Sequence, residues 1–321
     1  MFFKNARLFY LTEPFDYSQE ELESQLSELH FTPCNNYEKS SLGWVSPLGD
    51  AETSEDDAET APLLTHVIGN FIMVCAQNQD RLLPMSVVRQ ETAEKVAEIE
   101  QRQSRKVYRK ERREIQDNVY ASLLPRAFTK NQQTYAFISV KDRLLVVDSA
   151  SASRAEELVN LLRDSLTSFP VGLPQTRTAP ADIMTRWLRD KKLATNFSLL
   201  EDVVLHNPQD SNNVVRCTSQ DLTGDEIAIH LDAGKQVKSL ALSWNHVIHC
   251  LVNDDLSIKR LQFEAIEENM EGAEDVTPAQ KFDQDFALMT LELSGFFNAL
   301  FDAFGGLGEV RPMGRKNKDD E

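Results

Sequence analysis

The segment TYAFISVKDRLLVVD (residues 134–148) contains two apolar runs that are separated by a polar dipeptide. Both runs are rich in β-branched, leucine and aromatic residues, and Lys141-Asp142 between them suits a tight turn. The segment therefore predicts an antiparallel β-hairpin with strands over 134–140 and 143–148. A second hairpin is predicted further along the chain, with a strand over 240–252, a turn at 253–255 and a strand over 256–263.

Other strands and helices surround these hairpins without a regular βαβ alternation. Strands are predicted over 2–12, 67–76 and 214–217, and a short helix over 183–188, whereas 197–205 is ambiguous. Capping boxes, in which a Ser or Thr precedes an acid or Gln by three residues, predict helix starts at Ser18, Ser153, Thr223 and Thr277. These elements indicate an α+β fold with antiparallel sheets and long helices.

The helix predicted after Thr277 is unusually apolar and ends at Gly305-Gly306. Its apolar residues cover more surface than one narrow stripe, so the helix is either deeply buried or partly an interface. They are Phe282, Phe286, Met289, Leu293, Phe296, Phe297, Leu300 and Phe301.

Residues 86–119 contain no Gly and no Pro, and their composition predicts one long helix. Only Val107 and Tyr108 are apolar between Glu100 and Glu114, so this helix is expected to project from the body or to line an opening. Its basic residues recur at spacings of three, four and seven, which places most of them on one broad face as a basic ridge. These residues are Arg102, Arg105, Lys106, Arg109, Lys110, Arg112 and Arg113.

The charge of the chain is strongly segregated. The 321 residues carry a net charge of −17, yet residues 102–113 hold seven bases and one acid and so contribute +6. Residues 50–60 and 264–275 each hold six acids and no base. Because most of the surface must repel phosphate, any nucleic-acid site is expected to be local.

We divide the chain into four parts on these grounds. They are an N-terminal α+β part (1–80) with a disordered acidic insertion at 50–60, a basic helix with its following loop (81–130), a C-terminal α+β part with the Phe-rich helix (131–306), and a disordered tail (307–321).

The sequence contains no recognisable membrane span, secretory signal or paired-cysteine motif. The longest apolar run has six residues (71–76), whereas a membrane-spanning helix needs about 20. No secretory signal is recognisable at the N-terminus, which predicts a cytoplasmic protein. Cys34, Cys75, Cys217 and Cys250 form no C-x-x-C pair, which indicates reduced, mostly buried thiols and no zinc site.

Three candidate chemical motifs are better explained structurally. Gly234-Lys235 lacks the other residues of a phosphate loop, and Gly234 is expected to end a helix. His246 and His249 lie in a predicted strand, where residues three apart face opposite sides and cannot share a metal ion. His246 is interpreted as a core residue, because it falls on the same face as Trp244 and Ile248. The adjacent Asp254 and Asp255 are expected in a turn. Nothing in the sequence demands an enzyme, a metal or a cofactor.

Charge alone leaves the function of the basic ridge open. A solvated helix face, or an internal partner for the acidic segments, explains it as well as DNA binding does. Phe128, in the segment LPRAF, is by itself more typical of a core plug than of a contact.

Eight collinear segments resemble the recombination-associated RdgC proteins of proteobacteria. The resemblance implies a non-enzymatic, nucleoid-associated protein that binds DNA with little sequence preference, forms a ring-shaped dimer from elongated subunits and restrains the RecA recombinase. The segments are FTPC (31–34), GWVSPLG (43–49), LTHV (64–67), SLLPRAF (122–128), SQDLTGDEI (219–227), AGKQVKSLALSW (233–244), IKRLQF (258–263) and FDQDFALMTLEL (282–293).

The resemblance extends the set of expected contacts. It assigns DNA contacts to the basic ridge and to Arg126, Lys235, Lys238, Lys259 and Arg260. We add Lys130, because clustered cations without a base-reading element suit phosphates. Phe128 is expected to contact the second copy in a homodimer. Two departures from the family pattern are Thr218-Ser219, where relatives often carry lysines, and the acidic insertion at 50–60.

An alternative function remains open. The chain could be an acidic, protein-only adaptor that binds the recombinase directly and touches DNA incidentally. Salt-dependent DNA binding separates the two, since an acidic adaptor releases no counterions from a duplex.

Overall fold

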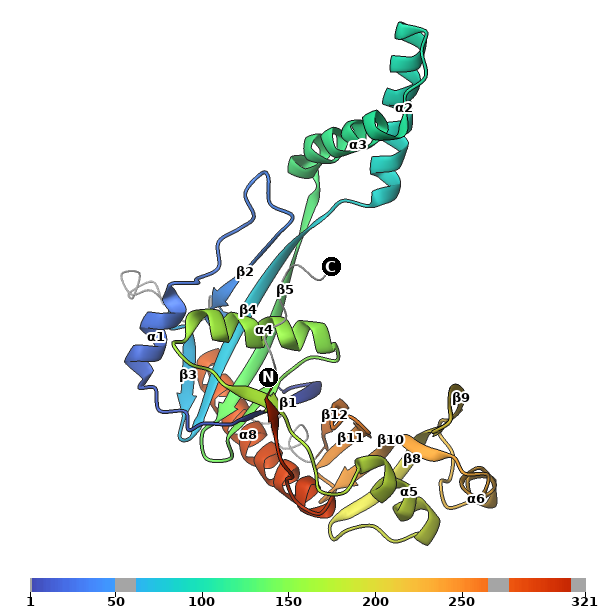
Figure 1. Ribbon diagram of the computed structural model, residues 1–321. Helices are drawn as coiled ribbons and strands as arrows, with labels where there is room; N and C mark the ends of the chain where they lie inside the picture. Colours follow the sequence, from blue (N-terminus) through green and yellow to red (C-terminus); the bar gives the residue numbers. More distant parts are fainter. Residues whose placement is uncertain (1, 50–61, 265–276, 313–321) are drawn as a thin grey trace.

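The computed structural model describes residues 2–49, 62–264 and 277–312 and consists of a body with a projecting helical arm (Figure 1). The body is built on a strongly bent antiparallel β-sheet, and β1 (Asn5–Leu11) belongs to both of its halves. The arm lies at the far end of two long strands of this sheet (Figure 1). The α+β class and the antiparallel pairing predicted from the sequence are therefore confirmed.

The first half of the sheet contains the hairpin predicted over 134–148. β5 (Phe128–Ser139) pairs with β6 (Leu144–Val147), for example through Ile138 opposite Leu145. The remaining order is β2 (Ser40–Val45), β4 (Phe71–Leu82), β5, β6 and β1, while β3 (Thr65–Ile68) pairs with β4. The prediction of one strand over 67–76 was wrong, because the chain reverses at Gly69, whose φ of +57° suits glycine in a turn.

The other half of the sheet continues from β1 through five further strands. Their order is β12 (Ile258–Phe263), β11 (Ile248–Asn253), β10 (Gln236–Trp244), β8 (Phe197–Asn207) and β9 (Asp210–Cys217). The ambiguous segment 197–205 thus lies in a strand, and the turn at 253–255 is confirmed.

The strand predicted over 240–252 is in fact two strands. The chain turns through Asn245 and His246, which both have positive φ, and Val247 N donates to Trp244 O at 3.0 Å. His246 is consequently exposed, and its interpretation as a core residue was wrong. Apolar residues continue on both sides of this turn, which conceals it in the sequence.

Two apolar cores lie on opposite faces of the first half of the sheet. On one face, α1 (Gln19–Ser27) and α4 (Ala152–Ser165) cover residues such as Trp44 and Phe9. On the other face, α8 (Pro278–Ala303) covers a core that continues under the second half of the sheet with α5 (Pro180–Asp190) and α6 (Asp225–Asp232).

Helix α8 resolves the choice between a buried helix and an interface. Phe286, Phe296, Phe297 and Phe301 are at most 4% exposed, so the Phe-rich surface is filled within one subunit. Only Leu288 and Leu291 are exposed among the large apolar residues of this helix. Of the two alternatives, these residues of α8 fit the deeply buried helix.

The predicted helix caps agree with the structure at two of four positions. Ser18 and Thr277 form complete capping boxes, as expected. The cap of α4 is Ser151 rather than Ser153, and the cap of α6 is Gly224 rather than Thr223. Gly234, with a φ of +84°, follows the end of α6 as predicted.

Residues at the C-terminal end of the described chain also join the sheet. β13 (Arg311–Pro312) pairs with β7 (Val171–Leu173), which in turn pairs with β1. Part of the segment expected to be a disordered tail therefore has regular structure. The acidic insertion at 50–60 and nearly all of the acidic segment 264–275 lie outside the described residues.

The arm contains two helices where the sequence predicted one. α2 (Met85–Gln103) ends at Ser104, which adopts the left-handed conformation (φ 48°, ψ 36°), and α3 (Arg109–Leu123) folds back against it. The break allows Val88 and Val96 of α2 and Val119 of α3 to be buried. One continuous, nearly all-polar helix would leave these residues without an apolar partner, so packing prevails over local helix propensity.

Candidate nucleic-acid interface

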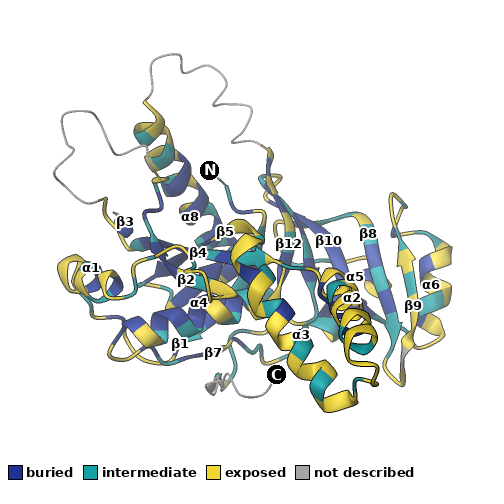
Figure 2. Ribbon diagram, turned by 90° about the horizontal axis from the view of Figure 1, so that it is seen from above, coloured by how far each residue is buried: buried dark blue, intermediate teal, exposed yellow. Residues whose placement is uncertain are grey.

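The tip of the arm concentrates the exposed cations. Gln103 ends α2 and Arg109 begins α3, and residues 104–108 form the elbow between the two helices. Exposed residues dominate α2 and α3 in Figure 2. The seven predicted ridge residues are all exposed: Arg102, Arg105, Lys106, Arg109, Lys110, Arg112 and Arg113.

These cations do not form the single-helix ridge that the sequence predicted. Arg102 lies in the last turn of α2, Arg105 and Lys106 lie in the elbow, and the other four lie in the first turns of α3. The base of α2, by contrast, is acidic, because residues 85–100 hold four acids and two bases. The positive field is therefore focused on the tip of the arm rather than spread along it.

Arg105 has a structural role within the elbow. Its Nη1 and Nη2 donate to the two carboxylate oxygens of Glu111 at 2.7 and 2.5 Å, and its Nε donates to Gln103 Oε1 at 2.7 Å. The hydrogen bonds with Arg105 lower the pKa of Glu111 and those with Glu111 raise the pKa of Arg105. Arg105 thus joins the end of α2 to α3, and its charge is partly compensated.

The N-terminus of α3 favours an anion. Its N-cap is Tyr108, whose side chain makes no capping hydrogen bond, so the first backbone N–H groups of the helix are not capped. Arg109, Lys110 and Arg112 stand in the same turns, where the helix dipole disfavours cations by about 0.3–1 kcal/mol each. A bound phosphate would satisfy both the N–H groups and the cations.

Tyr108 is a candidate contact that the sequence reasoning did not single out. It is 76% exposed and lies between Lys106 and Arg109 at the elbow. An exposed aromatic ring between cations can stack on a nucleobase without selecting its identity. Its only signal in the sequence is an aromatic residue within a basic run.

The base of the arm holds a second group of predicted residues. Arg126 ends the 3₁₀ turn η2 (Leu124–Arg126), and Lys130 lies on β5 opposite Asp80 of β4. Both side chains are exposed. Since Lys130 faces an acid across the strand pair, its field is weaker than that of the tip.

Phe128 is the first residue of β5 and is 84% exposed. Considered alone, Phe128 was expected to plug the core, and this interpretation was wrong. It pairs with Leu82, which is 50% exposed, and Met85 begins the adjoining helix at 43% exposure. These three exposed apolar residues lie at the base of the arm and are called the arm-base patch.

A third set of predicted cations lies on the second half of the sheet. Lys238 of β10 and Lys259 of β12 line one groove of about 310 Å³ together with Arg216 of β9, which the sequence reasoning did not include. Asp254 and Asp255 line the same groove. The groove therefore combines three cations with two carboxylates.

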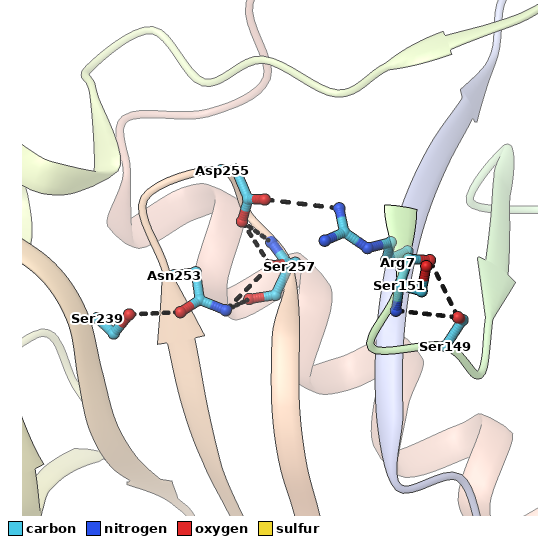
Figure 3. Close-up of polar contacts among 7 residues, drawn as sticks. All are labelled: Arg7, Ser149, Ser151, Ser239, Asn253, Asp255 and Ser257. Carbon is cyan, nitrogen blue, oxygen red and sulfur yellow. Dashed lines mark hydrogen bonds and ion pairs between the residues drawn. The ribbon is translucent and has the colours of Figure 1, made fainter. Parts of the chain in front are cut away.

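One of these carboxylates, that of Asp255, is held by a polar network (Figure 3). Asp255 Oδ2 pairs with Arg7 Nη1 at 3.5 Å, while its Oδ1 accepts from Ser257 N at 3.0 Å. Asn253 Nδ2 donates to Ser257 Oγ at 2.9 Å and links the turn to Ser239. The turn interpretation of Asp254-Asp255 fits these contacts.

Lys235 and Arg260 do not join Lys238 and Lys259. Lys235 Nζ bonds to Asn213 and lines a different groove, beside Arg186 and Arg189 of α5. Arg260 Nη1 forms an ion pair with Asp202 Oδ2 at 2.8 Å. The structure thus separates these expected contacts into different surfaces.

The remaining chemical candidates are compatible with structural roles. His249 Nδ1 lies 2.9 Å from Glu264 Oε1, on the strand after the exposed turn that contains His246. Within residues 2–49, 62–264 and 277–312, no group of three or more His, Cys, Asp or Glu could hold a metal ion. The four cysteines are free, and burial raises the pKa of the Cys75 thiol to about 12. No helix in the described part of the chain is long and apolar enough to cross a membrane.

The structure defines the protein as an α+β protein whose body carries a projecting arm with a basic tip. A family model described as "Putative exonuclease, RdgC" matches residues 1–307. Recombination-associated protein RdgC of Aeromonas hydrophila is 40% identical over 309 residues, which is 95% of this chain and 98% of that protein. The proteins of the same name from Yersinia enterocolitica and Yersinia pestis are 40% identical over 308 residues with the same coverage. The chain belongs to the RdgC family of recombination-associated proteins.

Proposed function

We propose that the protein binds DNA without sequence preference through the tip of its arm and thereby restrains RecA-mediated recombination. The observation that carries the proposal is the concentration of exposed cations at the elbow, on a chain whose net charge is −17. An anionic body repels DNA, so productive contact is confined to the arm.

Contacts to the phosphate backbone explain the lack of sequence preference. The tip presents arginines and lysines, the uncapped N-terminus of α3 and one exposed aromatic ring. These groups suit phosphates and stacked bases, which are common to all sequences. The groove with Arg216, Lys238 and Lys259 would supply weaker contacts, because two carboxylates share it.

We propose further that the protein acts as a homodimer that closes into a ring. The arm-base patch offers Phe128, Leu82 and Met85 to a second copy. Ring closure would turn the basic tips toward an enclosed duplex and leave most acidic surface outside, in a cytoplasmic, nucleoid-associated protein. The ring, the dimer and the antagonism of RecA rest on the family resemblance.

A salt titration of DNA binding tests the main proposal. If about five phosphates are neutralised, the logarithm of the binding constant on duplex DNA falls with the logarithm of salt at a slope of about −4 to −5. Reversing Arg109 and Arg112 to Glu should flatten this slope and weaken binding to every sequence alike. The matched control reverses Arg89 and Lys95, which lie on the same arm but in its acidic base, and should change binding less.

We propose no catalytic role, since the name of the curated relatives describes an association with recombination rather than a reaction. The family description nevertheless contains the word exonuclease, and this possibility has a direct test. End-labelled duplex and single-stranded DNA incubated with the protein and Mg²⁺ should stay at full length. Progressive shortening from the ends would contradict the proposal.

A further inference from the structure

The arm joins the body through a narrow base. The chain enters the arm at Leu83-Pro84, after β4, and returns through η2 into β5. Val88, Val96 and Val119 are buried within the arm but belong to neither of the two main cores described for the body. Contacts at the base must therefore determine how the arm is oriented.

The side chain of Arg81 forms hydrogen bonds with two of the segments that meet at this base. It lies on β4, one residue before the strand ends, and its side chain is partly buried. Nη1 donates to the carbonyl oxygens of Leu124 and Pro125 at 3.2 and 3.4 Å, within η2. Nη2 donates to the carbonyl oxygens of Cys34 and Asn35 at 3.4 and 3.0 Å. One guanidinium thus connects the turn η2, through which the chain leaves the arm, to the loop 31–39.

The loop 31–39 is itself fixed to the body at its start. Phe31 N donates to Trp44 O at 2.9 Å, next to the fully buried Trp44 side chain. The loop approaches β2 so closely at Gly43 that a Cβ there would lie 2.5 Å from Phe31 Cα. The loop therefore begins on a rigid part of the body.

Further bonds fix the loop next to Arg81. Cys34 N donates to Gln79 Oε1 at 2.7 Å, and Arg81 N donates to Lys39 O at 2.8 Å. Gln79 Nε2 also donates to Asn131 Oδ1 on β5 at 2.8 Å. The loop consequently connects the body to the base of the arm through these hydrogen bonds.

The chemistry of arginine suits this position. The planar guanidinium presents donors in two directions, so it can hold two carbonyl pairs on different segments at once. Among the ion pairs of the described residues, none includes Arg81, and its bonds go to backbone carbonyls. A lysine ammonium is a single point and cannot span both segments in the same way.

We propose that Arg81 is a positioning residue that holds the arm at one orientation relative to the body. This inference rests on the proposed function for its significance, because a fixed arm keeps the basic tip and Phe128 in place for DNA and for the second copy. The orientation itself can be measured without DNA.

The experiment measures the distance distribution between an arm label and a body label. Spin labels are attached through unnatural amino acids at Gln101, near the tip of α2, and at Ser153 on α4, both exposed. The full chain should give one narrow distribution. Arg81→Ala should broaden or shift it and lower the affinity for duplex DNA. Arg81→Lys, which keeps the charge and the aliphatic stem, should broaden the distribution as well.

Arg126→Ala is the matched control at the same turn. It removes an exposed cation of η2 and should leave the distance distribution unchanged while weakening DNA binding. An unchanged distribution in a folded Arg81→Lys protein would overturn the inference, whatever happens to Arg81→Ala. If Arg81→Ala and Arg81→Lys broaden the distribution while reversal of Arg109 and Arg112 to Glu leaves DNA affinity unchanged, the positioning role stands and the proposed DNA site at the tip is wrong.

Discussion

Glu111 binds both terminal nitrogens of Arg105, at 2.7 and 2.5 Å, across the elbow that separates α2 from α3. An arginine already paired in this bidentate manner has less charge to offer to a phosphate. Arg105→Ala should therefore reduce the salt slope of DNA binding less than Arg109→Ala, which should lower its magnitude by about 0.9. Equal effects of the two substitutions, measured by fluorescence anisotropy at several salt concentrations, would contradict this assignment.

Phe128→Ala should weaken self-association. The ring is 84% exposed in the single subunit, and burial against a second copy would remove apolar area from water. Sedimentation equilibrium should show that the dimer of the variant dissociates at a higher protein concentration than the dimer of the unaltered protein. Leu291→Ala, the control on α8, removes a residue that is 64% exposed and should not alter the association constant. A monomer at micromolar concentration in the unaltered protein would refute the dimer.

Asp254 should make the contribution of the sheet groove depend on pH. Burial and the neighbouring Asp255 carboxylate raise the pKa of Asp254, whereas Lys238 and His206 oppose this shift. Ionisation of Asp254 therefore costs folding free energy above its raised pKa, and this cost disappears as the pH falls through the raised pKa toward the ordinary value.

Protonation of Asp254 also removes a negative charge beside Lys238 and Lys259. DNA affinity should rise on moderate acidification, and Asp254→Asn should raise it at neutral pH while reducing the pH dependence. Parallel anisotropy titrations of both proteins over this pH range test the prediction. A variant that binds DNA more weakly at neutral pH would show that Asp254 supports the site.

Gly43→Ala should destabilise the protein by about 1–3 kcal/mol, the usual range for overpacking. The new Cβ would lie 2.5 Å from Phe31 Cα, a backbone atom that cannot move without shifting the loop 31–39. Gly224→Ala is the control, because its Cβ would be 3.4 Å from the nearest atom, and it should cost less than about 1 kcal/mol. Urea denaturation measures both changes, and similar values for the two would exclude the close approach.

The hairpin over 134–148 and the caps at Ser18 and Thr277 were predictable because their signals are local. Apolar runs around a polar dipeptide and side-chain caps depend only on neighbouring positions. The reversals at Gly69-Asn70 and Asn245-His246 were missed, since apolar residues continue on both sides of each turn. Where both flanking strands are apolar, a short turn changes the composition very little.

The break at Ser104 depended on packing that the sequence pattern does not display. Residues 86–119 favour a helix throughout, whereas the elbow lets α2 pack against α3 and buries Val88, Val96 and Val119. The basic residues were found by their charge, whereas their placement on one helix face was wrong. Arg81 carried no signal, because its partners are backbone carbonyls of segments more than 40 residues away.

If the protein restrains RecA by occupying DNA, inhibition of strand exchange should require enough protein to cover the DNA. Inhibition should weaken with rising salt in parallel with DNA binding, because both depend on the same phosphate contacts. Reversing Arg109 and Arg112 to Glu should abolish it, while reversing Arg89 and Lys95 should not. An acidic adaptor that holds the recombinase directly would behave differently, since its inhibition would persist after the first reversal and fail when residues 50–60 are deleted. Strand-exchange assays with these three variants separate the mechanisms. Full inhibition by the protein with Arg109 and Arg112 reversed would contradict the occupancy mechanism and favour direct binding of the recombinase.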